Sequence, residues 1–197
     1  MFNPQPVTLS TDRIELQPLS LDHAQAFHLA TNDDAIWTWM VPNPCKTIEA
    51  TQKWITTALV ERDAGRQVPF VTIDKASGKL VGSTRFLSIM RADKGIEIGH
   101  TWINPEFQRG YVNSHAKYCM LQHAFETLGA IRVEFKTHAS NQKSRNAILR
   151  LGAQFEGIMR QQRILPDGHL RNTALFSIID GEWPEVKQQL LTQLERI

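Results

Sequence analysis

Residues 97–153 read EIGHTWINPEFQRGYVNSHAKYCMLQHAFETLGAIRVEFKTHASNQKSRNAILRLGA, and the order of elements in this stretch decides the fold. Hydrophobic periodicity and the positions of Pro and Gly divide the region into five elements. They are a strand over 96–103, a loop over 104–112, a helix over 113–128, a strand over 132–138 and a short helix over 141–151. Gly129 and Gly152 follow the two helices and are typical helix ends.

The segments on either side of this region add further strands and helices. They are a strand over 13–19, helices beginning near Leu21 and Thr47, strands over 70–74 and 80–90, strands over 155–164 and 172–179, and a last helix after Pro184. Short Gly-bearing turns before 80–90 and 96–103 predict an antiparallel meander. The order β-α-α-β-β-β-α-β-α-β-β-α predicts one sheet with helices against it. Because no repeat or linker interrupts the chain, we expect a single domain over 1–197.

Composition excludes several classes of protein. The 22 Lys and Arg and 20 Asp and Glu give a net charge of +2, which does not favour nucleic-acid binding. No apolar stretch reaches the roughly 18 residues of a membrane span, and the first residues lack the features of a signal peptide. We therefore expect a cytoplasmic protein without membrane contact. Cys45 and Cys119 form no CxxC pair and the seven histidines no HExxH motif, so we expect no metal site.

The start of the helix over 113–128 is a candidate anion site. Its first backbone N–H groups have no partner within the helix, and the helix dipole favours negative charge there. Gly110 permits close approach to the loop backbone, and Arg109 adds positive charge. The sequence contains no GxxxxGK[ST] or GxGxxG motif, so neither a P-loop nor a Rossmann site is expected. On these residues alone, a plain strand-to-helix connection is the simpler interpretation.

Three motifs lie before, within and after this loop and helix: Glu97-Ile98-Gly99, VNSHAK at 112–117 and Asn141-Gln142-Lys143-Ser144. With these motifs the chain resembles the GNAT superfamily of N-acetyltransferases, most closely the branch that contains bacterial ribosomal-protein N-terminal acetyltransferases. The resemblance extends from RIELQPL at 13–19 to EWPEV at 182–186. It implies an α/β (α+β) GNAT fold, in which a single mixed, mostly antiparallel sheet is splayed in the middle and flanked by helices.

The resemblance also implies a binding site for acetyl-CoA, the acetyl donor. The pantetheine arm would lie along the strand before the loop, the pyrophosphate on the loop backbone, and the short helix would contact the arm. The residues that the resemblance assigns to this site are Trp102, Ile103, Gln108, Arg109, Gly110, Tyr111, Val112, Asn113 and Asn141.

The loop departs from the [QR]-x-x-G-x-[GA] pattern of the superfamily. If the pattern begins at Gln108, Tyr111 occupies the Gly position and Asn113 the small one. If it begins one residue earlier, Gly110 matches, but Val112 fills the small position. The helix residues favour the first register. A Tyr111 ring that points outward leaves the backbone cradle intact, whereas a ring that points inward narrows it.

Acetyl transfer needs an acceptor for the proton of the amine and a proton for the leaving thiolate. The resemblance implies Glu97 as the proton acceptor, often through water, and an ion pair with Arg or Lys is an equally weighted alternative. His100 is another candidate base, although a cross-strand or acceptor contact is the simpler role. Because no Tyr follows residue 138, Ser144 or water would protonate the sulfur. Asn141 and Ser144 are also common helix caps.

These observations lead to an expected function. We expect an acetyl-CoA-dependent N-acetyltransferase that acts on a primary amine by direct transfer in a ternary complex. The acceptor would be a small amine or a protein N-terminus, such as that of a ribosomal protein. The stretch that carries Trp37 and Trp39 would border the acceptor, with one Trp packed in the core and the other lining a pocket. The alternative is a non-catalytic acyl-CoA-binding sensor on the same fold, suggested by the altered loop and the missing Tyr. A homodimer is a further implication of the branch.

Overall fold

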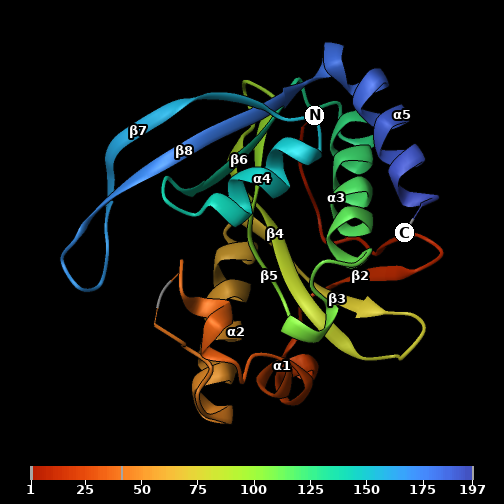
Figure 1. Cartoon of the computed structure of the whole chain (residues 1–197). Coiled ribbons are helices and arrows are strands. Elements are labelled where there is room, and N and C mark those ends of the chain that lie inside the picture. The colour runs from red at the N-terminus through yellow and green to blue at the C-terminus, as the bar shows by residue number, and fades with distance from the viewer. Residues whose placement is uncertain (1, 41, 197) are drawn as a thin grey trace.

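The computed structural model describes residues 2–40 and 42–196. Within these residues eight strands form one sheet in the order β1-β2-β3-β4-β5-β6-β8-β7 (Figure 1). The strands are β1 (Leu9–Ser10), β2 (Ile14–Pro18), β3 (Gln67–Asp74), β4 (Leu80–Met90), β5 (Gly95–Ile103), β6 (Arg132–His138), β7 (Gln154–Ile164) and β8 (Leu170–Ile179). The helices are α1 (Ala24–Ala30), α2 (Ile48–Asp63), α3 (Val112–Gln122), α4 (Gln142–Arg150) and α5 (Trp183–Leu194).

The element order agrees with the sequence prediction, with local differences. The meander is confirmed, because β3, β4 and β5 pair antiparallel. β1 was not predicted, since a two-residue strand has no measurable period. The helix expected over 113–128 is α-helical only to Gln122 and continues as a π-helical turn over His123–Thr127. The chain then leaves the helix at Gly129, whose φ is +69°.

Among the strands of the described residues, β5 and β6 are the one parallel pair, and their pairing is short. It covers Gly95–Glu97 on β5 and Arg132–Glu134 on β6. Beyond these residues β5 continues to Ile103 and β6 to His138 without pairing to each other. We call the point after Glu97 and Glu134, where the strands separate, the fork. The predicted mixed, mostly antiparallel and splayed sheet is therefore confirmed.

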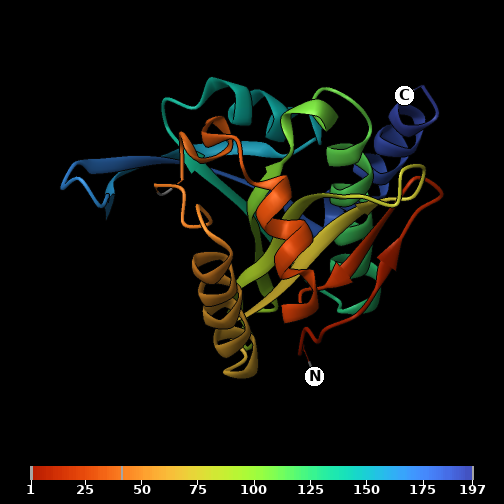
Figure 2. The same ribbon diagram turned by 90° about the horizontal axis from the view of Figure 1, so that it is seen from below.

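Helices cover the two faces of the sheet unequally. α3 and α5 pack on one face, where Val68 and Phe70 of β3 meet Met120 and Leu190 in the larger core. α1 and α2 lie next to each other on the opposite face, over the β3–β4 half of the sheet (Figure 2). Val71 points into this second core, as the period of two in a strand requires. The hairpin of β7 and β8 extends beyond the other elements (Figure 1).

None of the helices in the described part of the chain combines the length and apolar composition that crossing a bilayer requires.

Candidate functional site

β5 carries a bulge just beyond the fork. Thr84 on β4 opposes both His100 and Thr101 on β5, and His100 has a φ of +48°. A bulge bends its strand and increases the local twist, which carries the end of β5 away from β6. The backbone groups of 98–103 that face β6 have no partner in that strand. They can bind a ligand in the opening.

The loop between β5 and α3 is held in place by Gln108. Its Nε2 donates to the carbonyl oxygen of Ile103 at 2.8 Å. Its Oε1 accepts from Nζ of Lys143, in the first turn of α4, at 2.5 Å. Because α4 follows β6, the loop connects the ends of the two strands that separate at the fork. Arg109 next to it is exposed and has a φ of +63°.

The N-terminus of α3 has unpaired donors and open space beside it. No described side chain caps the helix, and its first backbone bond runs from His115 N to Tyr111 O at 3.0 Å. The N–H groups of 112–114 therefore lack intrahelical partners. A Cβ at Gly110 would meet only the carbonyl oxygen of Phe107, at 3.9 Å. Together with the helix dipole, these features suit a phosphate on the loop backbone.

The Tyr111 side chain is held outside this space. Its hydroxyl donates to Oδ1 of Asp74 at 2.6 Å, and its ring packs edge-on to His115 with centroids 5.9 Å apart. The Arg13 guanidinium lies 3.8 Å from the ring centroid. Arg13 precedes β2 and Asp74 ends β3, so the ring points towards the half of the sheet that does not contain the fork. The outward orientation, which leaves the cradle open, is the one observed.

α4 begins beside the fork with a side-chain cap. Oδ1 of Asn141 accepts from Ser144 N at 3.0 Å, so Asn141 has the capping role that the sequence allowed. Ser144 is half-buried, and its hydroxyl bonds to none of the described residues. The cap orients the first turn of α4, and the hydroxyl stays available to a ligand.

Glu97 lies at the fork with one carboxylate oxygen bound and one free. Its Oε2 accepts from Ser88 Oγ and from Lys136 Nζ, both at 2.9 Å. Its Oε1 accepts from none of the residues in 2–40 and 42–196. The residue is only 6% exposed. The predicted ion pair is therefore present, and the carboxylate also keeps a free acceptor atom at the opening.

The fork, the uncapped helix and this carboxylate define the candidate site. Comparison with known proteins identifies the family of the chain. A family model described as "Acetyltransferase (GNAT) domain" matches residues 13–154, well over half of the chain. The chain belongs to the GNAT acetyltransferase family. As the sequence predicted, this GNAT protein is an N-acetyltransferase whose acetyl donor is acetyl-CoA.

Individual relatives of this GNAT chain cover most of its length. It is 31% identical to a GCN5-related N-acetyltransferase from Brucella melitensis, with a TM-score of 0.91 over 98% of this chain and 87% of that one. It is 23% identical to the uncharacterized N-acetyltransferase YoaA of Bacillus subtilis strain 168, over 87% of this chain and 96% of YoaA. Mycobacterium smegmatis RimJ, in complex with CoA-disulfide, has a TM-score of 0.81, 22% identity and 95% coverage of both chains, which shows the fold alone.

The side chains predicted to line the GNAT arm site differ in how they can contribute. The Trp102 ring is buried and packs edge-on against Phe27, with centroids 5.0 Å apart. Trp102 and Ile103 therefore offer a ligand mainly their backbone. Trp37 is 4% exposed and belongs to the core, whereas Trp39 is 42% exposed and its ring centroid lies 5.0 Å from that of His138. One of the two therefore packs in the core, as expected, and the placement of Trp39 beside the acceptor stays a prediction.

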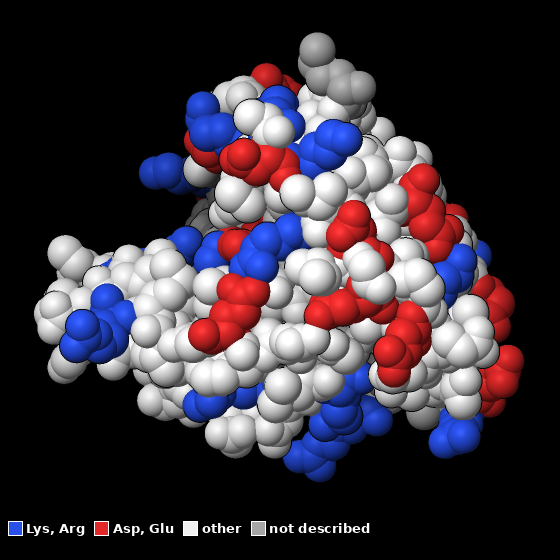
Figure 3. All heavy atoms as spheres, turned by 90° about the horizontal axis from the view of Figure 1, so that it is seen from above, with Lys and Arg blue, Asp and Glu red and all other residues white. Residues whose placement is uncertain are grey.

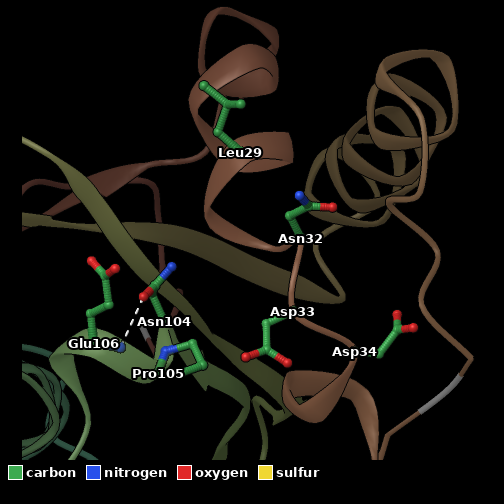
Figure 4. Close-up of a pocket in the computed structure, with 7 residues that line it drawn as sticks. All are labelled: Leu29, Asn32, Asp33, Asp34, Asn104, Pro105 and Glu106. Atoms are coloured by element: carbon green, nitrogen blue, oxygen red, sulfur yellow. Dashed lines mark hydrogen bonds between the residues drawn. The ribbon is translucent and has the colours of Figure 1, made fainter.

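A hollow beside the end of β5 has no signal in the sequence. It has a volume of about 420 Å³ and lies between the end of α1 and the residues that follow β5 (Figure 4). Asp33, Asp34 and Glu106 line it, and no Lys or Arg does so. Carboxylates repel phosphate groups, so this hollow is not suited to the pyrophosphate.

Proposed function

We propose that this GNAT enzyme transfers the acetyl group directly to a primary amine, a small amine or a protein N-terminus, in a ternary complex at the fork. The observation that carries the proposal is that three features occur together. The unpaired edge of β5, the uncapped N-terminus of α3 and the free Oε1 of Glu97 all lie at one opening in the sheet. A donor and an amine held together there would gain mainly from proximity.

The residues present fit the donor. The N–H groups of 112–114 and the open space at Gly110 would hold the pyrophosphate. Gln108 and Arg109 would form the adjacent loop wall, and the backbone of 98–103 would bond to the pantetheine arm. The donor supplies an activated acetyl group as a thioester.

The proposed transfer needs no covalent enzyme intermediate. The lone pair of the neutral amine forms a bond to the carbonyl carbon, the carbon–sulfur bond breaks, and the amine nitrogen loses one proton while the thiolate gains one. Glu97 accepts the amine proton through Oε1, directly or through water. His100 is a poor base, because burial and the nearby charges of Arg85, Arg163 and Arg171 lower its pKa to about 3.

Gly110 gives the first prediction. Gly110→Val should raise the Kd for acetyl-CoA at least about tenfold, because the added side chain would fill space proposed for the pyrophosphate. Only Phe107 O lies within 4 Å of a Cβ at this position, so the free energy of unfolding should change little. Calorimetric titration and chemical denaturation measure the two effects.

Gly181→Val is the matched control, because a Cβ there has no atom within 4 Å and Gly181 lies outside the proposed site. Equal affinity of Gly110→Val and the unchanged protein for acetyl-CoA would contradict the placement of the pyrophosphate.

Ser144 gives the second prediction. Its free hydroxyl is the proposed proton donor to the thiolate, with water as the substitute. Ser144→Ala should lower kcat by about tenfold and leave the Kd for acetyl-CoA unchanged, because the backbone N–H bonded to Asn141 remains. Asn146→Ala on the same helix is the control. An unchanged kcat would remove this role from Ser144.

A coupled assay of CoA thiol release tests the function as a whole. The assay would use pooled small amines and peptides with free N-termini, including N-terminal sequences of ribosomal proteins. We expect release that depends on both acetyl-CoA and an acceptor, with an acetylated amine found by mass spectrometry. Tight binding of acetyl-CoA without turnover of any acceptor would instead favour the acyl-CoA sensor.

A further inference from the structure

Three arginines near the fork have no acidic partner. Arg85 on β4 is only 6% exposed, and Arg163 and Arg171 face each other across the β7–β8 hairpin. In residues 2–40 and 42–196, no carboxylate oxygen lies within 4 Å of any of these guanidinium groups. Burying or juxtaposing unpaired positive charges is unfavourable. The cluster therefore has positive charge without a direct ion-pair partner in the described part of the chain.

The same cluster contains buried polar atoms without hydrogen-bond partners. They are Nε of Arg85, Nε of Arg171 and Nδ1 of His100. The other known contacts of Arg85 are neutral or aromatic: one terminal nitrogen donates to Gln67 Oε1 at 2.8 Å, and its Cζ lies 5.7 Å from the Trp54 ring centroid. Buried polar atoms are normally paired, so an acceptor from a bound molecule would satisfy the two arginine donors.

These side chains are gathered on the face of the sheet that also presents Glu97. Arg85 lies opposite Gly99 in the strand register. Gly99 and Glu97 are two residues apart on β5, so Arg85 and Glu97 share one face of the sheet. The charges of Arg85, Arg163 and Arg171 all lower the pKa of His100. The charge of Arg163 lowers the pKa of Arg171, and the charge of Glu97 raises it. Figure 3 shows Lys and Arg atoms, and no Asp or Glu atoms, at the outer end of the protruding hairpin on the face in view.

The neighbouring carboxylates are already engaged. Glu97 bonds to Lys136, Glu134 bonds to Lys136 and Arg132, and Glu156 forms two bonds to Arg132. They cannot neutralise the arginines without breaking these pairs. An oxyanion from a bound molecule would supply the missing charge and acceptors, and Arg is the residue best suited to bind a carboxylate with two bonds.

We propose that Arg85, Arg163, Arg171 and His100 form a subsite for a carboxylate carried by the acceptor, so that the preferred substrate is an amine that also bears an acidic group. This inference rests on the proposed function, because it assigns a substrate class to the same opening. The carboxylate belongs either to a small amino acid or to an acidic residue close to a peptide N-terminus. The buried Arg85, with Arg163 and Arg171 beside it, would select the charge, and the fork would receive the amine.

Matched acceptors test the proposal in the coupled CoA-release assay. One pair is glutamate and glutamine, and the other is an Ala-Asp and an Ala-Asn peptide with free N-termini. We expect kcat/KM to favour the acidic member of at least one pair by about tenfold or more, as removal of a charged hydrogen bond does elsewhere. The pair with the larger preference distinguishes a small amino acid from a peptide.

Variants of the cluster make the test specific. Arg171→Gln should remove the preference by raising KM for the acidic acceptor, while KM for the neutral acceptor and for acetyl-CoA stays the same. Arg163→Gln should weaken the preference. Arg160→Gln is the control, because Arg160 lies on the same hairpin but is not among the charges that lower the pKa of His100. Turnover without a preference for the acidic member, or a preference that survives Arg171→Gln, would overturn the subsite but leave the proposed function intact.

A binding measurement keeps the subsite testable if no acceptor is turned over, an outcome that would count against the proposed function. Succinate, which has carboxylates but no amine, is titrated into the protein with CoA bound, and the His100 ring is followed by NMR. We expect a saturable shift that Arg171→Gln abolishes and Arg160→Gln keeps. The absence of such a shift would overturn the subsite whatever the activity.

Discussion

Glu97→Gln is expected to lower kcat by about 100-fold or more and to leave the Kd for acetyl-CoA unchanged, since loss of a general base costs about that much. The amide has the shape of the carboxylate but cannot accept a proton at Oε1. The fold should tolerate the change, because Lys136 keeps its bond to Glu134 at 2.7 Å and the amide oxygen can still accept from Ser88. We expect the free energy of unfolding to change by about 1 kcal/mol.

Glu134→Gln is the matched control for this variant. Glu134 is the direct partner of Glu97 across the fork, but Arg132 binds its Oε1 and Lys136 its Oε2, so it has no free oxygen for an amine. Its replacement should affect kcat less than about tenfold. Steady-state kinetics at saturating acetyl-CoA measure both variants. If Glu97→Gln and Glu134→Gln have the same small effect on kcat, the ion pair is purely structural and the base lies elsewhere.

The sequence predicts those parts of the site that depend on local patterns. Periodicity predicts the helix whose N-terminus forms the candidate phosphate site. Capping chemistry within a few residues predicts the Asn141 cap. The GNAT resemblance then supplied the fold and the donor, which periodicity alone does not contain. Parallel pairing of β5 with β6 over only three residues has no local signal either.

Other features depend on residues that are distant in sequence. The direction of the Tyr111 ring is set by Asp74 and Arg13, which come from the other half of the sheet. The arginine cluster joins β4 to the β7–β8 hairpin, so Arg85 and Arg171 are ordinary surface candidates until the strands are arranged. Such features arise from tertiary packing, and no pattern within one segment predicts them.

Lys117 is another such feature, and it gives the prediction with the largest expected effect on stability. Its side chain is buried beneath the β4–β5 pair, where Nζ donates to Thr101 Oγ1 at 2.6 Å and to Thr84 Oγ1 at 3.1 Å. It has no carboxylate within 4 Å among the described residues. Burial lowers its pKa from 10.5 to about 7. The folded protein therefore binds fewer protons than the unfolded chain between these two values.

The sign of the pH dependence follows from this difference. Stability rises with pH wherever the unfolded state binds more protons. A shift of this size corresponds to a penalty of about 4 kcal/mol at pH 7, and about 1.5 kcal/mol of it should be relieved by pH 8.5. Below about pH 6.5 buried histidines add slope of the same sign. Above pH 9 the buried Cys119, whose pKa burial raises to about 12, adds slope of the opposite sign. Lys117 therefore makes the largest single contribution to the slope between pH 7 and 8.5.

Lys117→Met should stabilise the protein by about 2–4 kcal/mol at pH 7, since an apolar chain of similar length removes the buried charge at the cost of two hydrogen bonds. The hydroxyls of Thr84 and Thr101 lie 2.9 Å apart and can bond to each other in the variant. Urea denaturation between pH 7 and 8.5 should give a nearly flat stability curve for Lys117→Met. Lys53→Met, on the exposed side of α2, should keep the rising curve of the unchanged protein. A destabilised Lys117→Met variant with the same slope would mean that the ammonium is stabilised in the folded state and that burial carries no penalty.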